Sequence, residues 1–98
     1  MMINLNNNYN YYEMSRLFSL LCNANIPCEI RPCYDGLQLC YPSIKNCVCD
    51  AILHGGSYGH EKGLLEIMGL CEVDYDDVEG YLTADDVFSR IKQHYYGE

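Results

Sequence analysis

Between residues 28 and 54, three short segments with strand-like patterns are separated by turn residues, and this arrangement constrains the fold most strongly. The segments are Cys28–Tyr34, Leu37–Tyr41 and Cys47–His54. Asp35-Gly36 is a two-residue turn of the kind that suits a twisted hairpin, and residues 42–46 form a second turn. We therefore predict three consecutive antiparallel strands. The first should lie at an edge of the sheet, because Pro32 cannot donate a ladder hydrogen bond.

The segment before these strands has the spacing of an amphipathic helix. Its apolar stripe consists of Met14, Leu17, Phe18 and Leu21. The helix should end near Asn23-Ala24-Asn25, because asparagine tolerates a left-handed cap and Pro27 disfavours helix at the residue before it. The sequence predicts a helix over about residues 10–23.

A second helix is predicted near the end of the chain, over about residues 84–95. Thr83 is the expected N-cap, and Asp86 stands where the acid of a capping box reaches back. The predicted buried stripe consists of Val87, Phe88, Ile91 and Tyr95.

The segment Leu64–Met68, between Gly63 and Gly69, fits a fourth strand better than a helix. We expect Glu72–Glu79 to be an acidic connection that leads to the last helix. The predicted fold class is therefore α+β, a four-stranded antiparallel sheet in the order α-β-β-β-β-α with both helices packed on one face. Residues 1–98 should form a single domain.

The charge balance limits the classes of partner. The chain has fourteen acidic and six basic residues, a formal charge of −8, so direct nucleic-acid binding is not expected. A basic protein surface would be attracted instead. The polar N-terminal segment lacks the pattern of a signal peptide, and no apolar run is long enough for a membrane span. The expected location is the cytoplasm.

Seven cysteines are many for this length, but their number is odd and none forms a CxxC pair. In the cytoplasm, thiols stay reduced and mostly pack as small hydrophobes. We predict seven thiols, no structural metal and no cofactor.

The stretch from His54 to Gly63 combines four glycines with two histidines, a serine and a tyrosine, and has the composition of a binding loop. Three interpretations remain open: a purely structural connection, a small-molecule pocket, or a metal site formed by His54, His60 and Glu61. In the pocket interpretation, backbone amides form an anion-binding nest, Ser57 donates a hydrogen bond and Tyr58 stacks on a ring. The candidate ligand-binding residues are His54, Gly55, Gly56, Ser57, Tyr58, Gly59, His60 and Glu61.

The acidic stretch is a second candidate surface, for docking on a basic partner. Its candidate residues are Glu72, Asp74, Tyr75, Asp76, Asp77 and Glu79. The alternative is a solvated connection followed by an acidic first helical turn. The spacing does not match a calcium-binding loop.

Tyrosines also gather near both ends of the chain. They are Tyr9, Tyr11, Tyr12, Tyr95 and Tyr96. If the two helices pair, these residues could form the face of a homodimer or higher homo-oligomer. No nucleophile, base and orienting group stand in a recognisable pattern, so we predict no catalytic residue.

The segment from Asn46 to Gly69, centred on Ser57-Tyr58-Gly59-His60-Glu61-Lys62-Gly63-Leu64-Leu65-Glu66-Ile67-Met68-Gly69, resembles a family of small, largely uncharacterised proteins encoded by phages and prophages of Firmicutes. The likeness includes the ending from Gly80 to Phe88. It implies a phage setting but no assigned activity.

Small phage proteins often counter host defence by stoichiometric binding, which here is an analogy that does not depend on fold. The leading hypothesis is a non-enzymatic phage protein that inhibits a bacterial antiviral defence system. It would bind a defence protein or its nucleotide signal through the glycine-rich loop in the infected host. One alternative is an acidic inhibitor, similar to anti-CRISPR proteins, that docks on the nucleic-acid-binding surface of a defence nuclease. Another is a small metal-dependent enzyme.

Overall fold

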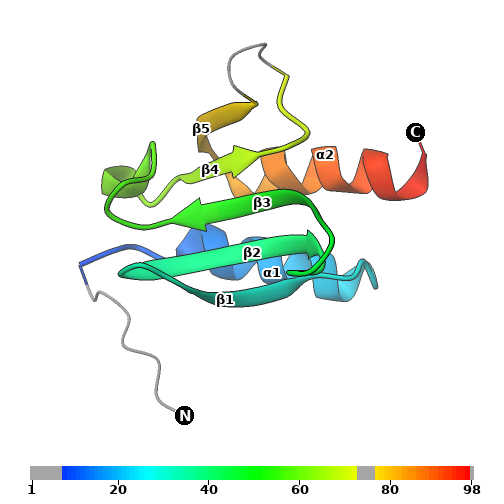
Figure 1. Ribbon diagram of the computed structural model, residues 1–98, viewed down its shortest axis with the longest axis horizontal. Helices are drawn as coiled ribbons and strands as arrows, with labels where there is room; N and C mark the ends of the chain where they lie inside the picture. The colour runs from blue at the N-terminus through cyan, green and yellow to red at the C-terminus, as the bar shows by residue number, and fades with distance from the viewer. Residues whose placement is uncertain (1–7, 73–76, 98) are drawn as a thin grey trace.

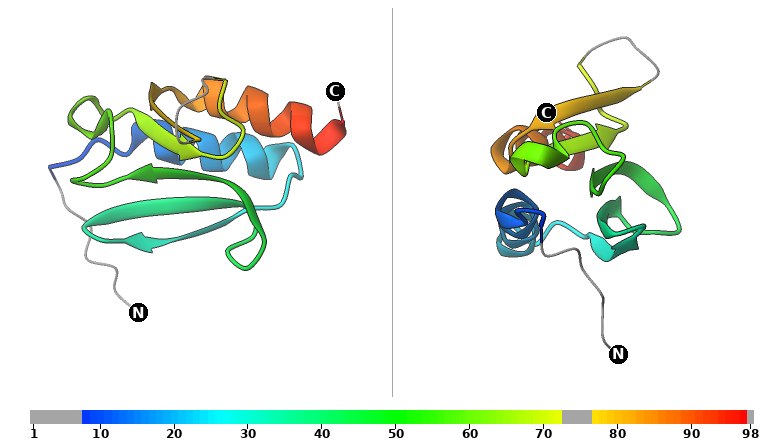
Figure 2. Two further views of the ribbon diagram at one scale, coloured as in Figure 1. Left: turned by 45° about the horizontal axis from the view of Figure 1, so that its top comes forward. Right: turned by 90° about the vertical axis from the view of Figure 1, so that its left-hand side faces the viewer.

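A five-stranded antiparallel sheet lies against two helices, which cover the same face (Figures 1 and 2). The computed structural model describes residues 8–72 and 77–97. Its elements are α1 (Tyr12–Asn23), β1 (Glu29–Cys33), β2 (Gly36–Pro42), β3 (Cys47–Leu53), the 3₁₀ turn η1 (His60–Lys62), β4 (Leu65–Met68), β5 (Val78–Leu82) and α2 (Ala84–Tyr96). The α+β class, the antiparallel sheet and β1 as an edge strand are confirmed. The predicted number of strands is wrong, because the described residues form a sheet of five strands and not four.

The additional strand is β5, which begins inside the segment that we expected to be an acidic connection. It pairs with β4, with Met68 opposite Val78 and Leu65 opposite Leu82. Glu79 and Gly80 interrupt the strand-favouring residues Val78, Tyr81 and Leu82, so pairing with β4 decides the conformation of this segment.

The fifth strand also sets the direction of α2. After an odd number of antiparallel strands, α2 starts at the same end of the sheet as α1 and runs parallel to it (Figure 1). At the N-terminal ends of the helices, Arg16 bonds to Asp85, and at the C-terminal ends the Tyr96 hydroxyl donates to the Ala24 carbonyl. Tyr9, Tyr11 and Tyr12 therefore lie at one end of the helix pair, and Tyr95 and Tyr96 at the other. The expected common tyrosine face is wrong.

The first hairpin turn consists of Tyr34 and Asp35, not of Asp35 and Gly36. Cys33 pairs with Gly36, which is thus the first residue of β2. Tyr34 takes the positive φ of +53° in this turn. Gly36 is required for a different reason, because a Cβ atom there would lie 1.8 Å from the Leu53 carbonyl oxygen.

The core lies between the sheet and the helices. Its fully buried side chains include Met14, Leu17, Leu21, Leu39, Leu53, Leu65, Ile67, Val87 and Ile91. Phe18 and Tyr95, predicted to be buried, are exposed by 38% and 44%, so each helix buries a narrower stripe than expected. The capping box of Thr83 and Asp86 is confirmed. Within the described ranges, neither helix is long and apolar enough to cross a membrane.

Candidate functional site

The glycine-rich loop connects β3 to β4 at the end of the sheet where the β1–β2 turn also lies (Figure 1). Asp35 of that turn accepts hydrogen bonds from the Gly55 amide, at 3.0 Å, and from the Tyr9 hydroxyl. Asn10, just before α1, packs against Gly63, where a Cβ atom would lie 2.9 Å from the Asn10 side chain. The loop is thus supported by both the hairpin turn and the segment that leads into α1.

Ser57 does not face solvent as the ligand-binding interpretation requires. The residue is only 3% exposed. Its hydroxyl donates to the His54 carbonyl at 2.9 Å and accepts from the His54 amide at 3.0 Å. Ser57 therefore closes the turn at the end of β3 and has a structural role.

The backbone amides of the loop are also bonded within the protein. Gly56 donates to Nδ1 of His54 at 2.9 Å, Ser57 to the His54 carbonyl at 3.0 Å, and Tyr58 to the Glu66 carboxylate at 2.9 Å. Together with the bond from Gly55 to Asp35, four successive amides have internal acceptors. This conformation does not present the anion-binding nest that we predicted.

His54 and Gly56 do line a hollow of about 400 Å³, together with Tyr34 and Asp35. The Tyr34 ring is 90% exposed and meets the His54 ring edge to face, with 5.0 Å between their centroids. Because the Gly56 amide donates to Nδ1 of His54, the neutral ring carries its proton on Nε2. His54 is only 9% exposed, and no hydrogen bond to its Nε2 is found among the described residues.

His60 faces a different side of the loop. Its Nδ1 lies 2.7 Å from the Ser57 carbonyl, which can only accept, so Nδ1 carries a proton. Its ring packs against Tyr9, with 5.8 Å between centroids. In residues 8–72 and 77–97, no three histidine, cysteine or acidic side chains are grouped so that they could hold a metal ion, and the proposed set of His54, His60 and Glu61 is not such a group.

Tyr58 and Glu61 turn toward β5 and away from the hollow. The Tyr81 amide donates to the Tyr58 carbonyl at 3.3 Å, and the Tyr81 hydroxyl bonds to the Glu61 carboxylate. The pKa of Glu61 is lowered, first by its own backbone amide and then by this hydroxyl. The loop therefore presents two separate faces, one toward β1 and β2 and one toward β5.

Part of the predicted acidic surface is neutralised by Arg90 of α2. The guanidinium bonds to both oxygens of Glu79, at 2.6 and 2.8 Å, and lies 3.5 Å from Glu72. This hydrogen bonding is the main reason that the pKa of Glu79 is lowered. Asp77 is exposed. The other candidates, Asp74, Tyr75 and Asp76, lie outside the described residues.

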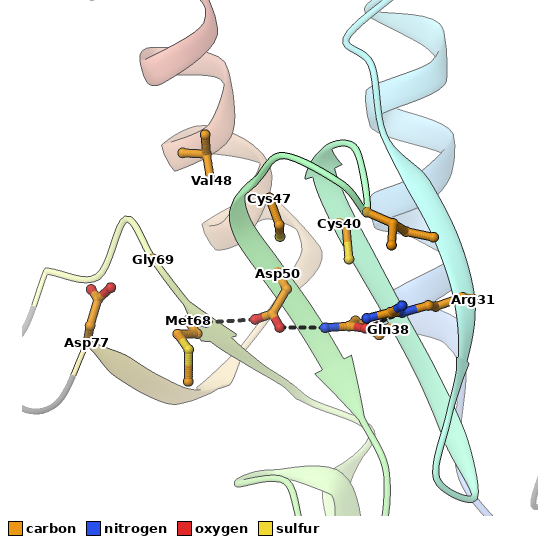
Figure 3. Close-up of a pocket in the computed structure, with 10 residues that line it drawn as sticks. Arg31, Gln38, Cys40, Cys47, Val48, Asp50, Met68, Gly69 and Asp77 are labelled. Carbon is orange, nitrogen blue, oxygen red and sulfur yellow. Dashed lines mark hydrogen bonds between the residues drawn. The ribbon is translucent and has the colours of Figure 1, made fainter.

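A second concavity, of about 320 Å³, lies on the sheet face opposite the helices (Figure 3). Arg31 donates to Gln38 at 2.7 Å, and Gln38 donates to Asp50 at 2.7 Å. Asp50 also accepts from the Met68 amide at 3.1 Å. These groups mainly satisfy one another across four strands, so we assign them a structural role.

The two most deeply buried thiols, Cys40 and Cys49, are not activated as nucleophiles. Burial raises the pKa of Cys49 to about 12. Burial, followed by electrostatic repulsion from Cys47 and a hydrogen bond with it, raises the pKa of Cys40 to about 12. A nucleophilic cysteine needs a lowered pKa instead.

Comparison of the chain with protein-family models, curated proteins and solved structures finds no match in any of the three. What the protein binds must therefore be inferred from its own side chains. Of the eight predicted ligand-binding residues, the structure brings His54 and Gly56 to a hollow. It adds Tyr34, which we had placed at the end of the first strand, and Asp35, which we had assigned to the turn that follows. The available signal for Tyr34 was an aromatic residue next to a hairpin turn, where its ring cannot reach the core.

Proposed function

We propose that the protein is a non-enzymatic, phage-encoded binding protein that inhibits a bacterial antiviral defence system in the cytoplasm of the infected host. Its ligand would be the nucleotide signal of that system. The hollow formed by Tyr34, Asp35, His54 and Gly56 carries this proposal. The phage setting is supported by the resemblance of residues 46–69 to phage proteins.

The hollow has the chemistry needed to hold a flat heterocycle. Its volume of about 400 Å³ suits one base or nucleoside, and ligand pockets of about 300–1,000 Å³ are typical. The exposed Tyr34 ring offers a stacking surface. Nε2–H of His54 can donate to a ring nitrogen or carbonyl of a base. Phosphates would extend into solvent, away from a chain with a charge of −8.

Acidic docking on a nucleic-acid-binding protein is the second candidate. The charge of −8 favours it, together with the exposed side chains of Glu72 and Asp77. Glu79 is less suited to a partner, because its carboxylate already binds Arg90 in two-point geometry.

Calorimetric titration with mononucleotides and with cyclic di- and trinucleotides tests the proposal. We expect saturable heat with at least one of these ligands, and at least a fivefold weaker affinity for Tyr34→Ala, because base stacking contributes about 1–3 kcal/mol. Tyr96→Ala is the matched control, since Tyr96 is also exposed but is the last residue of α2, which ends at the side of the molecule opposite the glycine-rich loop (Figure 1). Absence of heat with the whole panel would contradict the nucleotide part of the proposal.

The defence part is tested in cells. Expression of the protein in bacteria that carry a nucleotide-signalled defence system should restore phage plating, and expression of Tyr34→Ala should not. Equal plating with both proteins would show that the hollow does not mediate the inhibition.

A further inference from the structure

A bulge in β5 fixes the position of Tyr81. Leu82 pairs with Leu65 and Glu79 with Ile67, so Gly80 and Tyr81 together lie opposite the single residue Glu66. Tyr81 has a φ of +58°, a left-handed conformation that is uncommon for a bulky residue. Bulges often re-aim a side chain next to a functional site. Here the bulge places an aromatic ring where 53% of it is exposed.

Tyr58 is locked beside this bulge by two glycines. A Cβ atom at Gly80 would lie 2.3 Å from Cβ of Tyr58, and one at Gly59 would lie 3.1 Å from the Tyr81 backbone. The Tyr81 amide also donates to the Tyr58 carbonyl, at 3.3 Å. The two tyrosine backbones are thus held side by side, although the residues are far apart in the sequence.

Two exposed tyrosine side chains and one carboxylate lie at this place. Tyr58 is 62% exposed and Tyr81 is 53% exposed. The Glu61 carboxylate, also exposed, bonds to the Tyr81 hydroxyl. We name Tyr58, Glu61 and Tyr81 the tyrosine–glutamate surface. Its side chains fill no core, yet their backbones are fixed, which is the pre-organisation that lowers the cost of binding.

We propose that the tyrosine–glutamate surface is a docking site for an arginine side chain on a basic protein partner. A planar guanidinium can stack on a tyrosine ring while it pairs with a carboxylate, and arginine does both better than lysine. The chain's charge of −8 attracts a basic surface over a longer range. The same carboxylate repels the phosphates of a nucleic acid. A second copy of the chain carries the same net negative charge, so it is a poor occupant.

This surface lies on the β5 side of the loop, whereas the hollow of the proposed function lies on the β1 and β2 side. Either proposal can therefore be refuted while the other stands. The test is an NMR titration of the intact protein with two blocked tripeptides, Gly-Arg-Gly and Gly-citrulline-Gly, which have nearly the same shape but differ in charge. We expect the arginine peptide to give saturable shifts at Tyr58, Gly80 and Tyr81, and the citrulline peptide to give none. Tyr58→Ala should weaken arginine binding about two- to fivefold, the usual value of an exposed cation–π contact.

Two further variants make the result specific. Glu61→Gln should weaken binding of the arginine peptide more at low salt than at high salt. Tyr96→Ala, which removes a ring of similar exposure (52%), should leave the affinity unchanged. The amide spectrum of each variant reports whether the fold is kept, and Glu61→Gln decides the matter if Tyr58→Ala unfolds. The proposal is overturned if both peptides shift the same residues equally, if the shifts map to Glu72 and Asp77 instead, or if folded Glu61→Gln binds like the parent.

Discussion

At the scale of single residues, Tyr81 allows a test of backbone strain. Glycine in a strand is ordinarily less stable than alanine, because it loses more conformational freedom on folding. At a φ of +58° the order should reverse, because only glycine adopts this conformation without a steric penalty. Both substitutions remove the same ring, so their difference reports the backbone alone. We expect Tyr81→Gly to melt about 4 °C higher than Tyr81→Ala.

Thermal unfolding followed by circular dichroism measures this difference. The same pair of substitutions at Val78, in the regular part of β5, is the control, and there the glycine variant should melt lower. A lower melting temperature for Tyr81→Gly than for Tyr81→Ala would show that the positive φ carries no strain.

Gly80 in β5 and Gly56 in the glycine-rich loop should differ in their tolerance of a methyl group. At Gly80 a Cβ atom would meet Tyr58 Cβ at 2.3 Å, so Gly80→Ala must move backbone and should cost about 1–3 kcal/mol of unfolding free energy. At Gly56 the closest atom is Cε1 of the His54 ring, at 3.2 Å, so Gly56→Ala should be milder. It should still weaken ligand binding, because the methyl group enters the hollow. Urea titration and calorimetry measure the two effects. Equal losses of unfolding free energy for Gly80→Ala and Gly56→Ala would contradict the closer packing that we assign to Gly80.

At the scale of secondary-structure elements, the Arg90–Glu79 pair joins α2 to β5. Both side chains are largely shielded, with 12% and 17% exposure, so Glu79→Gln should cost about 2 kcal/mol at neutral pH. The bonded carboxylate has a pKa below its ordinary value of 4.5. The contribution of this ion pair to the unfolding free energy is therefore present above pH 4.5. It is lost as the pH falls through the lower pKa that Glu79 has in the folded state. Urea titrations of parent and variant should converge in strongly acidic solution. A stability difference that does not depend on pH would contradict an ionic origin.

The Arg16–Asp85 pair between α1 and α2 is the matched control, because it has the same two-point geometry but 36% and 69% exposure. Solvent screens such a pair, so Asp85→Asn should lower the stability much less than Glu79→Gln.

Elements with a local signal were predictable from the sequence. Helix α2 has a capping box, α1 ends at Asn23 and is followed by the left-handed Asn25, and β1 to β4 follow apolar patterns between turns. Strand β5 has no such signal, because its conformation depends on pairing with β4 across a bulge. The loop was identifiable as a candidate from its composition. Its division into two faces was not, because the β1–β2 turn and β5 supply Tyr34 and Tyr81 from distant parts of the sequence.

At the scale of the whole molecule, one strand changes the relation of the helices. With four strands α2 would run antiparallel to α1, and with five it runs parallel. The error in strand number therefore also separated the two tyrosine groups that we expected to meet. The register of the β1–β2 pair also determines which residues meet at the candidate site. The hairpin must end beside the glycine-rich loop for the Tyr34 ring to contact the His54 ring. Such long-range relations follow from sheet topology and are absent from local patterns.

The packing of the whole molecule can be measured through its seven cysteines. Cys22 and Cys47 are exposed, whereas Cys40 and Cys49 are only 1% exposed. Burial also raises the pKa of Cys49 to about 12, so little reactive thiolate forms near neutral pH. We expect iodoacetamide at pH 8 to modify Cys22 and Cys47 first. Cys49 should react only when the whole molecule unfolds, so its labelling rate should follow the global unfolding free energy measured in urea. Peptide mass spectrometry over time gives each rate. If Cys49 reacts as fast as Cys47, the layer between sheet and helices opens without global unfolding, which would contradict our expectation that this core unfolds as one cooperative unit.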